Sequence, residues 1–142
     1  MARERIQSAL IMEDDVDWDV MLKAQMTELA RGTRYLQGAV SSPHSPYGDD
    51  WWLISTGHCG ISIKTGEDQA HWVIDDDPTV VPWKHRQLFR HPDTRPHGLG
   101  GANTRLMFGL KGFICTASYA MSIKGALRVL YDQGILPNAK PV

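Results

Sequence analysis

The stretch Ile6-Gln7-Ser8-Ala9-Leu10-Ile11-Met12-Glu13-Asp14-Asp15 decides how the chain is interpreted, because an apolar run passes directly into three acids. A short apolar run bounded by polar residues predicts a buried strand of an α/β sheet. Ligands of open α/β sheets bind beyond the carboxyl ends of the strands, where these acids are expected. The stretch therefore predicts the fold class, α/β, and a place to look for function.

Carboxylates are concentrated after this strand, at Glu13, Asp14, Asp15, Asp17 and Asp19. Crowded carboxylates repel one another unless a cation compensates them, and Mg²⁺ typically takes one or two carboxylates together with water and phosphate oxygens. Glu13, Asp14 and Asp15 are therefore the candidate metal ligands. Asp17 continues the acidic spacing, although Asp17 and Asp19 are equally typical of residues that stabilise the N-terminus of a following helix.

A helix is predicted after the acids, because Trp18, Leu22, Met26 and Leu29 are spaced to form one apolar face. Gly32 is predicted to end it, since glycine readily adopts the left-handed conformation after a helix.

Further strands are predicted at 51–55 and, as a short hairpin, at 61–64 and 71–74. The segment 75–111 is rich in proline and glycine and lacks periodicity, so it predicts a long irregular loop. A third strand is expected at 113–120, followed by a helix that Ser122 caps and Gly134 ends. Alternating strands and helices of this kind belong to the α/β class.

The chain has 142 residues and a formal net charge of −1, with 42% hydrophobic and 22% charged residues. This length predicts one domain with a core of its own. Near-zero charge argues against a general nucleic-acid binder, which carries a basic excess. No apolar run approaches the ~20 residues of a membrane span, and no secretory signal is recognisable. Cys59 and Cys115 lie far apart and are expected to be ordinary buried thiols.

Several motifs in order along the chain resemble those of one family. Residues 9–16, Ala-Leu-Ile-Met-Glu-Asp-Asp-Val, resemble the strand and Glu-Asp-Asp motif of glycosyltransferase family 25, the lipopolysaccharide-biosynthesis and collagen galactosyltransferase type. Residues 47–54 with 57–60, and residues 76–80, resemble segments of its fungal members. Residues 117–126 resemble its Tyr-x-(Ile/Val)-Ser-x-x-Gly-Ala stretch.

The resemblance implies a GT-A-like (Rossmann-like) domain that transfers a sugar from a nucleotide diphosphate sugar to a hydroxyl of a saccharide or glycoprotein acceptor. By position, it implies that Glu13 and Asp15, with Asp14 beside them, hold Mn²⁺ or Mg²⁺ against the diphosphate. Such a metal neutralises the charge that develops on the nucleoside diphosphate as it leaves. No residue of this sequence is identified as the catalytic base.

The chain departs from the family at both ends. Family members have a strand and helix upstream of the Glu-Asp-Asp strand and a Pro-(x)-Asp segment after the last matching helix, and neither is recognisable here. We therefore expect residues 1–142 to form a single partial glycosyltransferase domain that is inactive alone. The compartment is left open, with the secretory pathway as an option for a longer parent protein.

Two further residues are candidates for substrate contacts besides Asp17. His58 lies in a Gly-flanked turn after a strand, where it would face the acceptor or a phosphate, although a loop histidine with a local hydrogen bond is the common alternative. Trp83 in the long loop offers an aromatic face on which a sugar can stack. The acids at 75–77 are better explained as a solvated turn.

Two alternatives stay open. The chain is compatible with a non-catalytic remnant of a glycosyltransferase, whose metal site no longer works. A phospho-receiver module also opens with a strand ending in paired acids, and Lys140-Pro141 fits its last strand. The receiver reaction needs a further Asp at a strand end, however, whereas the second apolar strand here runs into Ser55-Thr56-Gly57.

Overall fold

The chain is divided between two units, which a computed structural model describes over residues 1, 3, 4, 6–39, 44–63, 70–85 and 101–134. The first unit contains Met1–Val16, Asp50–His58 and Cys115–Val142. The second contains Asp17–Asp49 and Cys59–Ile114. Each unit has its own strands and one α-helix, and each is described by itself.

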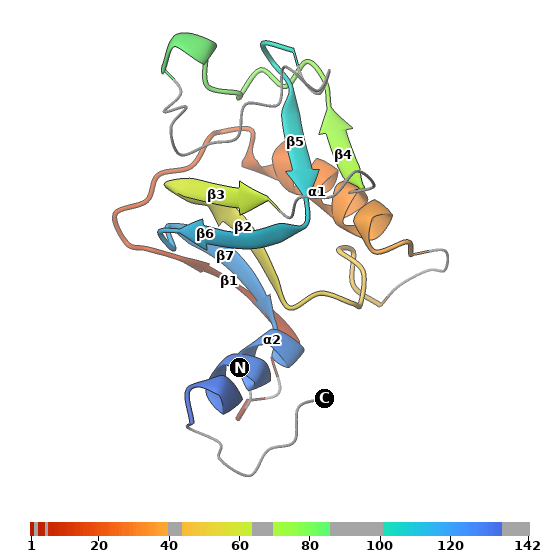
Figure 1. The fold of residues 1–142 in the computed structure, drawn as a ribbon, viewed down its shortest axis with the longest axis vertical. Coiled ribbons are helices and arrows are strands. Elements are labelled where there is room, and N and C mark those ends of the chain that lie inside the picture. Colours follow the sequence, from red (N-terminus) through yellow and green to blue (C-terminus); the bar gives the residue numbers. More distant parts are fainter. Residues whose placement is uncertain (2, 5, 40–43, 64–69, 86–100, 135–142) are drawn as a thin grey trace. The chain divides into compact units, whose positions relative to one another are not determined.

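The first unit is built on a three-stranded sheet in the order β1-β7-β2 (Figure 1). Its strands are β1 (Ser8–Met12), β7 (Ser118–Ser122) and β2 (Leu53–Gly57). The central strand β7 is antiparallel to both neighbours, so β1 and β2 run in the same direction. The strand predicted at the start of the chain is therefore present, although it is not buried, since Leu10 is 44% exposed. Its end lies at the same edge of the sheet as the end of β2.

The helix α2 (Ile123–Asp132) follows β7 without a loop and packs against it. Ser122 has extended backbone angles and caps the helix, because its hydroxyl accepts a hydrogen bond from the Gly125 N–H at 3.1 Å. The same hydroxyl donates to the Trp51 carbonyl at 2.6 Å, which ties the helix to the residues before β2. Gly134, with a φ of 72°, follows the helix end. The predicted helix between Ser122 and Gly134 is confirmed.

In the second unit, α1 (Leu22–Leu36) packs against the strand pair β4 (His71–Ile74) and β5 (Arg105–Phe108). The rings of Tyr35 and Trp72 meet with centroids 5.3 Å apart. A separate strand pair joins β3 (Gly60–Ile63) to β6 (Leu110–Ile114), and η1 (Trp83–His85) is a short 3₁₀ turn.

The prediction for the first helix is wrong at both ends. Trp18 precedes the helix and is 59% exposed, so it does not belong to the apolar face. Gly32 lies inside the helix, where a Cβ would come within 2.6 Å of the Met107 sulfur and 2.8 Å of Trp72. Close packing therefore accounts for the glycine at position 32. The glycine that follows the helix is Gly38, with a φ of 62°.

Three predictions about the strands also need correction. Strands β3 and β4 do not form a hairpin, because β3 pairs with β6 and β4 pairs with β5. The expected strand 113–120 is interrupted between β6 and β7, where Cys115 has a φ of 67°. The segment 75–111 is not irregular throughout, since η1, β5 and the start of β6 lie in it. Its residues 86–100 are outside the described part.

The expectation of buried thiols is wrong as well. Cys59 and Cys115 are both disulfide-bonded, and both are exposed. Cys59 is also bonded to the residue before Cys115, because the Cys59 N–H donates to the Ile114 carbonyl at 2.9 Å. The sequence separation of the two cysteines therefore did not reveal that they are disulfide-bonded.

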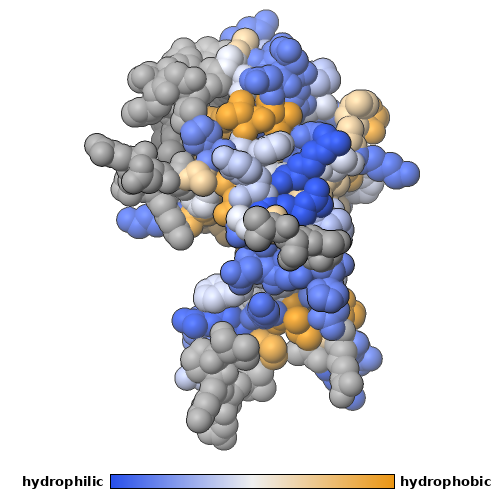
Figure 2. Space-filling model, turned by 90° about the vertical axis from the view of Figure 1, so that its right-hand side faces the viewer, coloured by the Kyte–Doolittle hydropathy of each residue, from blue (hydrophilic) through white to orange (hydrophobic). Residues whose placement is uncertain are grey.

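The described chain is a mixed α and β structure with two α-helices and strand pairs that are all antiparallel. This pairing is unlike the parallel sheet of receiver-type domains and equally unlike that of Rossmann-like domains. Neither described helix is long and apolar enough to cross a membrane. Among the described residues, Ala30 is the apolar residue that is buried. Figure 2 shows apolar patches on the surface.

Candidate metal and substrate site

The candidate site of the first unit lies where β1 and β2 end. Met12 of β1 and Gly57 of β2 are both paired with Ser118 of β7, on opposite sides of it. The residues that follow the two strands, Glu13 and His58, are therefore at the same edge of one sheet. Two segments far apart in sequence thus contribute candidate residues to one sheet edge.

Glu13 is fixed to the turn before β7 by two hydrogen bonds. Its backbone N–H donates to the Ala117 carbonyl at 3.0 Å, which extends the β1–β7 pairing by one residue. Its carboxylate Oε1 accepts from the Thr116 hydroxyl at 2.7 Å. Glu13 is an exposed residue. Thr116 thus orients a carboxylate that stays accessible to a ligand.

The sheet edge behind Glu13 carries a pair of hydroxyls. Thr56 and Ser118 lie with their hydroxyl oxygens 2.7 Å apart, and Ser118 is only 7% exposed. Between them Gly57 comes close to β7, since a Cβ there would lie 3.1 Å from the Ser118 nitrogen. A glycine before His58 therefore allows the end of β2 to approach the start of β7 closely.

Asp14 and Asp15 form an exposed turn directly after β1, closed by a bond from the Val16 N–H to the Glu13 carbonyl at 3.4 Å. No group of three His, Cys, Asp or Glu side chains within the described ranges is arranged to hold a metal ion. The chemistry of the donors still suits a hard cation, because Mg²⁺ needs only one or two carboxylates when a phosphate supplies further oxygens. The acids after β1 therefore fit a metal that is shared with a phosphate ligand.

The other two predicted contact residues, Asp17 and Trp83, belong to the second unit. Asp17 accepts from the Trp18 N–H at 2.8 Å, and Asp19 accepts from the Met21 N–H at 2.7 Å. These bonds order the turn before α1, but neither acid caps the helix, because its N-cap is Met21, no side chain caps it, and its first turn contains no acid. Trp83 lies in η1, and its side chain is outside the described part.

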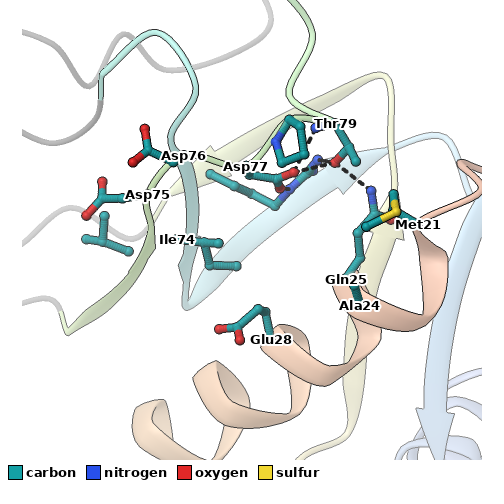
Figure 3. A pocket seen from close by; sticks show the side chains of 12 residues that line it. Met21, Ala24, Gln25, Glu28, Ile74, Asp75, Asp76, Asp77 and Thr79 are labelled. Carbon is teal, nitrogen blue, oxygen red and sulfur yellow. Dashed lines mark hydrogen bonds and ion pairs between the residues drawn. The ribbon is translucent and has the colours of Figure 1, made fainter.

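Sequence reasoning missed a second site, a pocket between α1 and the turn 75–79 (Figure 3). The acids 75–77 were expected to form a solvated turn, which holds for Asp75 and Asp76 but not for Asp77. The Asp77 side chain is 8% exposed and pairs with Arg105, with Oδ2 2.7 Å from Nε. The signal in the sequence was Asp77-Pro78-Thr79, a spacing at which an aspartate accepts from the backbone two residues on.

The ionisation of Asp77 follows from its partners. Burial on its own favours the neutral acid and raises the pKa. Hydrogen bonds from Arg105 and from the hydroxyl and N–H of Thr79, with the charge of Arg105, outweigh burial and lower the pKa of Asp77 below its ordinary value. The pocket therefore contains a stable carboxylate–guanidinium pair.

Comparison with protein-family models, with curated proteins and with solved structures finds no significant match to this chain. The resemblance to glycosyltransferases thus depends on the quoted motifs, and any activity is a proposal that the geometry can support.

Proposed function

We propose that the first unit is part of an incomplete GT-A-like domain, and that it binds a nucleotide diphosphate sugar for transfer of the sugar to an acceptor hydroxyl. The observation that supports this is that parts of three of the motifs lie in one unit, whereas residues 76–80 belong to the other. The strand before the acids, the strand after the two tryptophans and the Ser-x-x-Gly-Ala stretch are separate in sequence and become β1, β2 and β7–α2 of one unit. Motifs that share a function are expected to meet in this way.

The residues proposed to act are those at the sheet edge. Glu13, oriented by Thr116, and Asp15, at the exposed turn, would hold Mn²⁺ or Mg²⁺, with Asp14 beside them. When bound, the cation would neutralise charge that develops on the departing nucleoside diphosphate. His58 at the end of β2 would contact the phosphate or the acceptor. The acceptor is a saccharide or a glycoprotein, and none of these side chains is assigned as the general base.

The remaining motif residues have structural roles that support the same interpretation. Ser122 caps α2 and binds the residues before β2, and Gly125 allows the backbone of Trp52 to pass close to the helix. These contacts join the start of β2 to the end of β7, in the sheet whose opposite edge carries Glu13 and His58. We therefore propose that Ser122 and Gly125 of the Ser-x-x-Gly motif support the site to which Glu13, Asp14 and Asp15 contribute.

The proposal is tested by incubating the chain with MnCl₂, an acceptor sugar and UDP-sugars or GDP-sugars, and measuring both binding of the nucleotide sugar and release of the nucleoside diphosphate. We expect binding to depend on Mn²⁺, to be lost in Asp15→Asn and to persist in Glu4→Gln, which removes an equal charge at an exposed position. We expect no release, because the partial domain is expected to be inactive alone, and release that is lost in Asp15→Asn would overturn that expectation. Absence of both binding and release would overturn the proposal.

A further inference from the structure

Strand β1 is an outer strand of the three-stranded sheet in the first unit (Figure 1). It pairs with β7 on one side, and none of the described strands pairs with its other side, which we call the free side. The backbone along the free side presents N–H and C=O groups to which a further strand can bind. Proteins usually protect outer strands against such pairing, so the protection of β1 is informative.

The two outer strands of this sheet differ in protection. The pairing of β2 with β7 is irregular between Ser55 and Gly57, and an irregularity of this kind disturbs the addition of a further strand. The pairing of β1 is regular throughout Ser8–Met12, a stretch with no proline and no charged residue. Leu10, at the centre of β1, is 44% exposed. β1 is therefore the outer strand better suited to bind a partner.

The hydrogen bonds to β7 show which backbone groups of β1 point to the free side. The Glu13 N–H donates to the Ala117 carbonyl, and the Gln7 carbonyl accepts from the Ile123 N–H. Hydrogen-bonded pairs of antiparallel strands recur at every second residue, so the odd-numbered positions of β1 bond to β7. The N–H and C=O groups of the even-numbered positions therefore point to the free side.

This spacing makes the free side of β1 complementary to itself. When the Leu10 residues of two antiparallel copies lie opposite each other, Ser8 of each copy lies opposite Met12 of the other. All of these positions can then form hydrogen-bonded pairs, because their backbone groups face the free side in both copies. The two exposed Leu10 side chains become neighbours on one face of the joined sheet. A twofold axis at Leu10 thus satisfies both strands with one kind of chain.

The charges at the two ends of β1 favour the antiparallel direction. Residues 13–19 contain five acids, whereas residues 1–7 contain two arginines and one glutamate. In a parallel pair in register, the Glu13 residues of the two copies would be about 5 Å apart and would repel each other. In the antiparallel pair centred on Leu10 they are about 20 Å apart, which exceeds the Debye length of about 8 Å. Each acidic end then adjoins the net positive segment of the other copy.

We propose that the free side of β1 binds a second copy of this chain, with the two β1 strands antiparallel about Leu10 and the two sheets joined. The inference goes beyond the proposed sugar transfer and does not depend on it, because it uses the backbone of β1 rather than a ligand of the acids. One pair of five-residue strands is a small interface. We therefore expect a weak, reversible dimer with a Kd of about 1–100 µM.

The first test is sedimentation equilibrium of the whole chain from about 5 µM to about 1 mM, a range that brackets the expected Kd. The measured mass should rise with concentration from that of one chain to that of two, and should then level off. A chain that is still monomeric at the highest concentration would overturn the proposal. Continued growth beyond two copies would also overturn it, because a twofold pair is closed.

The second test uses charge at the centre of the interface, in the variants Leu10→Lys and Leu10→Glu. Each variant alone places like charges opposite each other, which should raise the dimer Kd by about tenfold or more. An equimolar mixture of the two should dimerise about as tightly as the wild type, because an ammonium then lies opposite a carboxylate. Val129→Lys, at a position of α2 that is 46% exposed, is the matched control and should change the Kd by less than about twofold.

Ser8→Pro tests the backbone without adding a charge. The Ser8 N–H points to the free side, so proline removes a bond of the dimer and none of the bonds to β7. We expect the Kd to rise by about tenfold or more, while circular dichroism shows that each variant is folded. Unchanged dimerisation of Leu10→Lys or of Ser8→Pro would overturn the proposal. A mixture of the two Leu10 variants that dimerises no better than either alone would show that the strands do not pair about Leu10.

Discussion

At the residue scale, Ser122 and Gly125 explain a sequence pattern that the motif alone left unexplained. Ser122 satisfies a free N–H at the start of α2 and the Trp51 carbonyl at the same time. Gly125 faces the Trp52 backbone so closely that no Cβ fits. Both residues therefore contribute to stability through contacts with the segment before β2, and both contributions are measurable.

Gly125→Ala should lower the free energy of unfolding by about 1–3 kcal/mol, because the new methyl group meets a carbonyl oxygen that is part of the backbone. The measurement is chemical denaturation followed by tryptophan fluorescence. Val129→Ala, on the same helix at a position 46% exposed, is the control and should change stability by less than about 0.5 kcal/mol. Equal stability of Gly125→Ala and the wild type would contradict the close approach.

Ser122→Ala should cost about 1–2 kcal/mol, since it removes the helix cap and leaves the Trp51 carbonyl without this donor. Ser122→Thr keeps a hydroxyl at the cap position and should recover most of the loss. Denaturation curves of the three proteins test this. A threonine variant as unstable as the alanine variant would show that the hydroxyl is not responsible.

Asp77 should make stability depend on pH in the acid range. Its pKa is lower in the folded chain than the ordinary value of 3.8, because the bonds from Arg105 and Thr79 outweigh burial. Its contribution is therefore fully present above pH 3.8 and is lost as the pH falls below that value through the lowered pKa.

The test compares wild type and Asp77→Asn by denaturation at pH 7 and at successively lower pH. We expect the wild type to be more stable by about 1–2 kcal/mol at pH 7, with a difference that shrinks on acidification. A difference that stays constant or grows at low pH would contradict the assignment of the carboxylate to this ion pair.

At the scale of elements, local sequence patterns predicted which helices and strands form, but not which strands pair with one another. The strand before Glu13 and the helix after Ser122 were predictable, because an apolar run and a cap signal are both local. The partners of β3 and β4 were not, because antiparallel pairing with β6 and β5 depends on contacts distant in sequence. The helical periodicity wrongly placed Trp18 in the first helix, because an apolar residue before a helix can by chance have the same spacing as those within it.

The candidate site shows the same limit. The acids after β1 were identified from sequence, whereas their position at the same sheet edge as His58 required the β1-β7-β2 order. The pocket around Asp77 was missed because its charge pair joins residues 28 positions apart. Only the local Asp-x-Thr bond pattern was visible beforehand.

Reduction of the disulfide-bonded cysteines provides a test at the same scale. Thiol titration of the denatured, unreduced chain should find no free thiol, and titration after reduction should find both Cys59 and Cys115. Removal of the disulfide should also lower stability, by about 2–4 kcal/mol, since a cross-link restricts the unfolded chain. Two titratable thiols before reduction would contradict the pairing.

At the scale of the whole molecule, a net charge of −1 conceals two separate acidic regions. One is the exposed turn after β1 in the first unit, and the other is the turn after β4 in the second. Their surroundings differ, since hydroxyls and a sheet edge adjoin the first and a pocket with polar and apolar walls adjoins the second. A metal and diphosphate are therefore assigned to the first region alone.

The central claim is that the acids after β1 bind a metal together with a nucleoside diphosphate. The most direct measurement is calorimetric titration of the chain with UDP and with GDP, each with and without Mn²⁺. The account predicts saturable binding of at least one of them only when Mn²⁺ is present, weakened about tenfold or more in Asp15→Asn and unchanged in Glu4→Gln. Absence of binding to both nucleotides, or equal binding by Asp15→Asn, would contradict it.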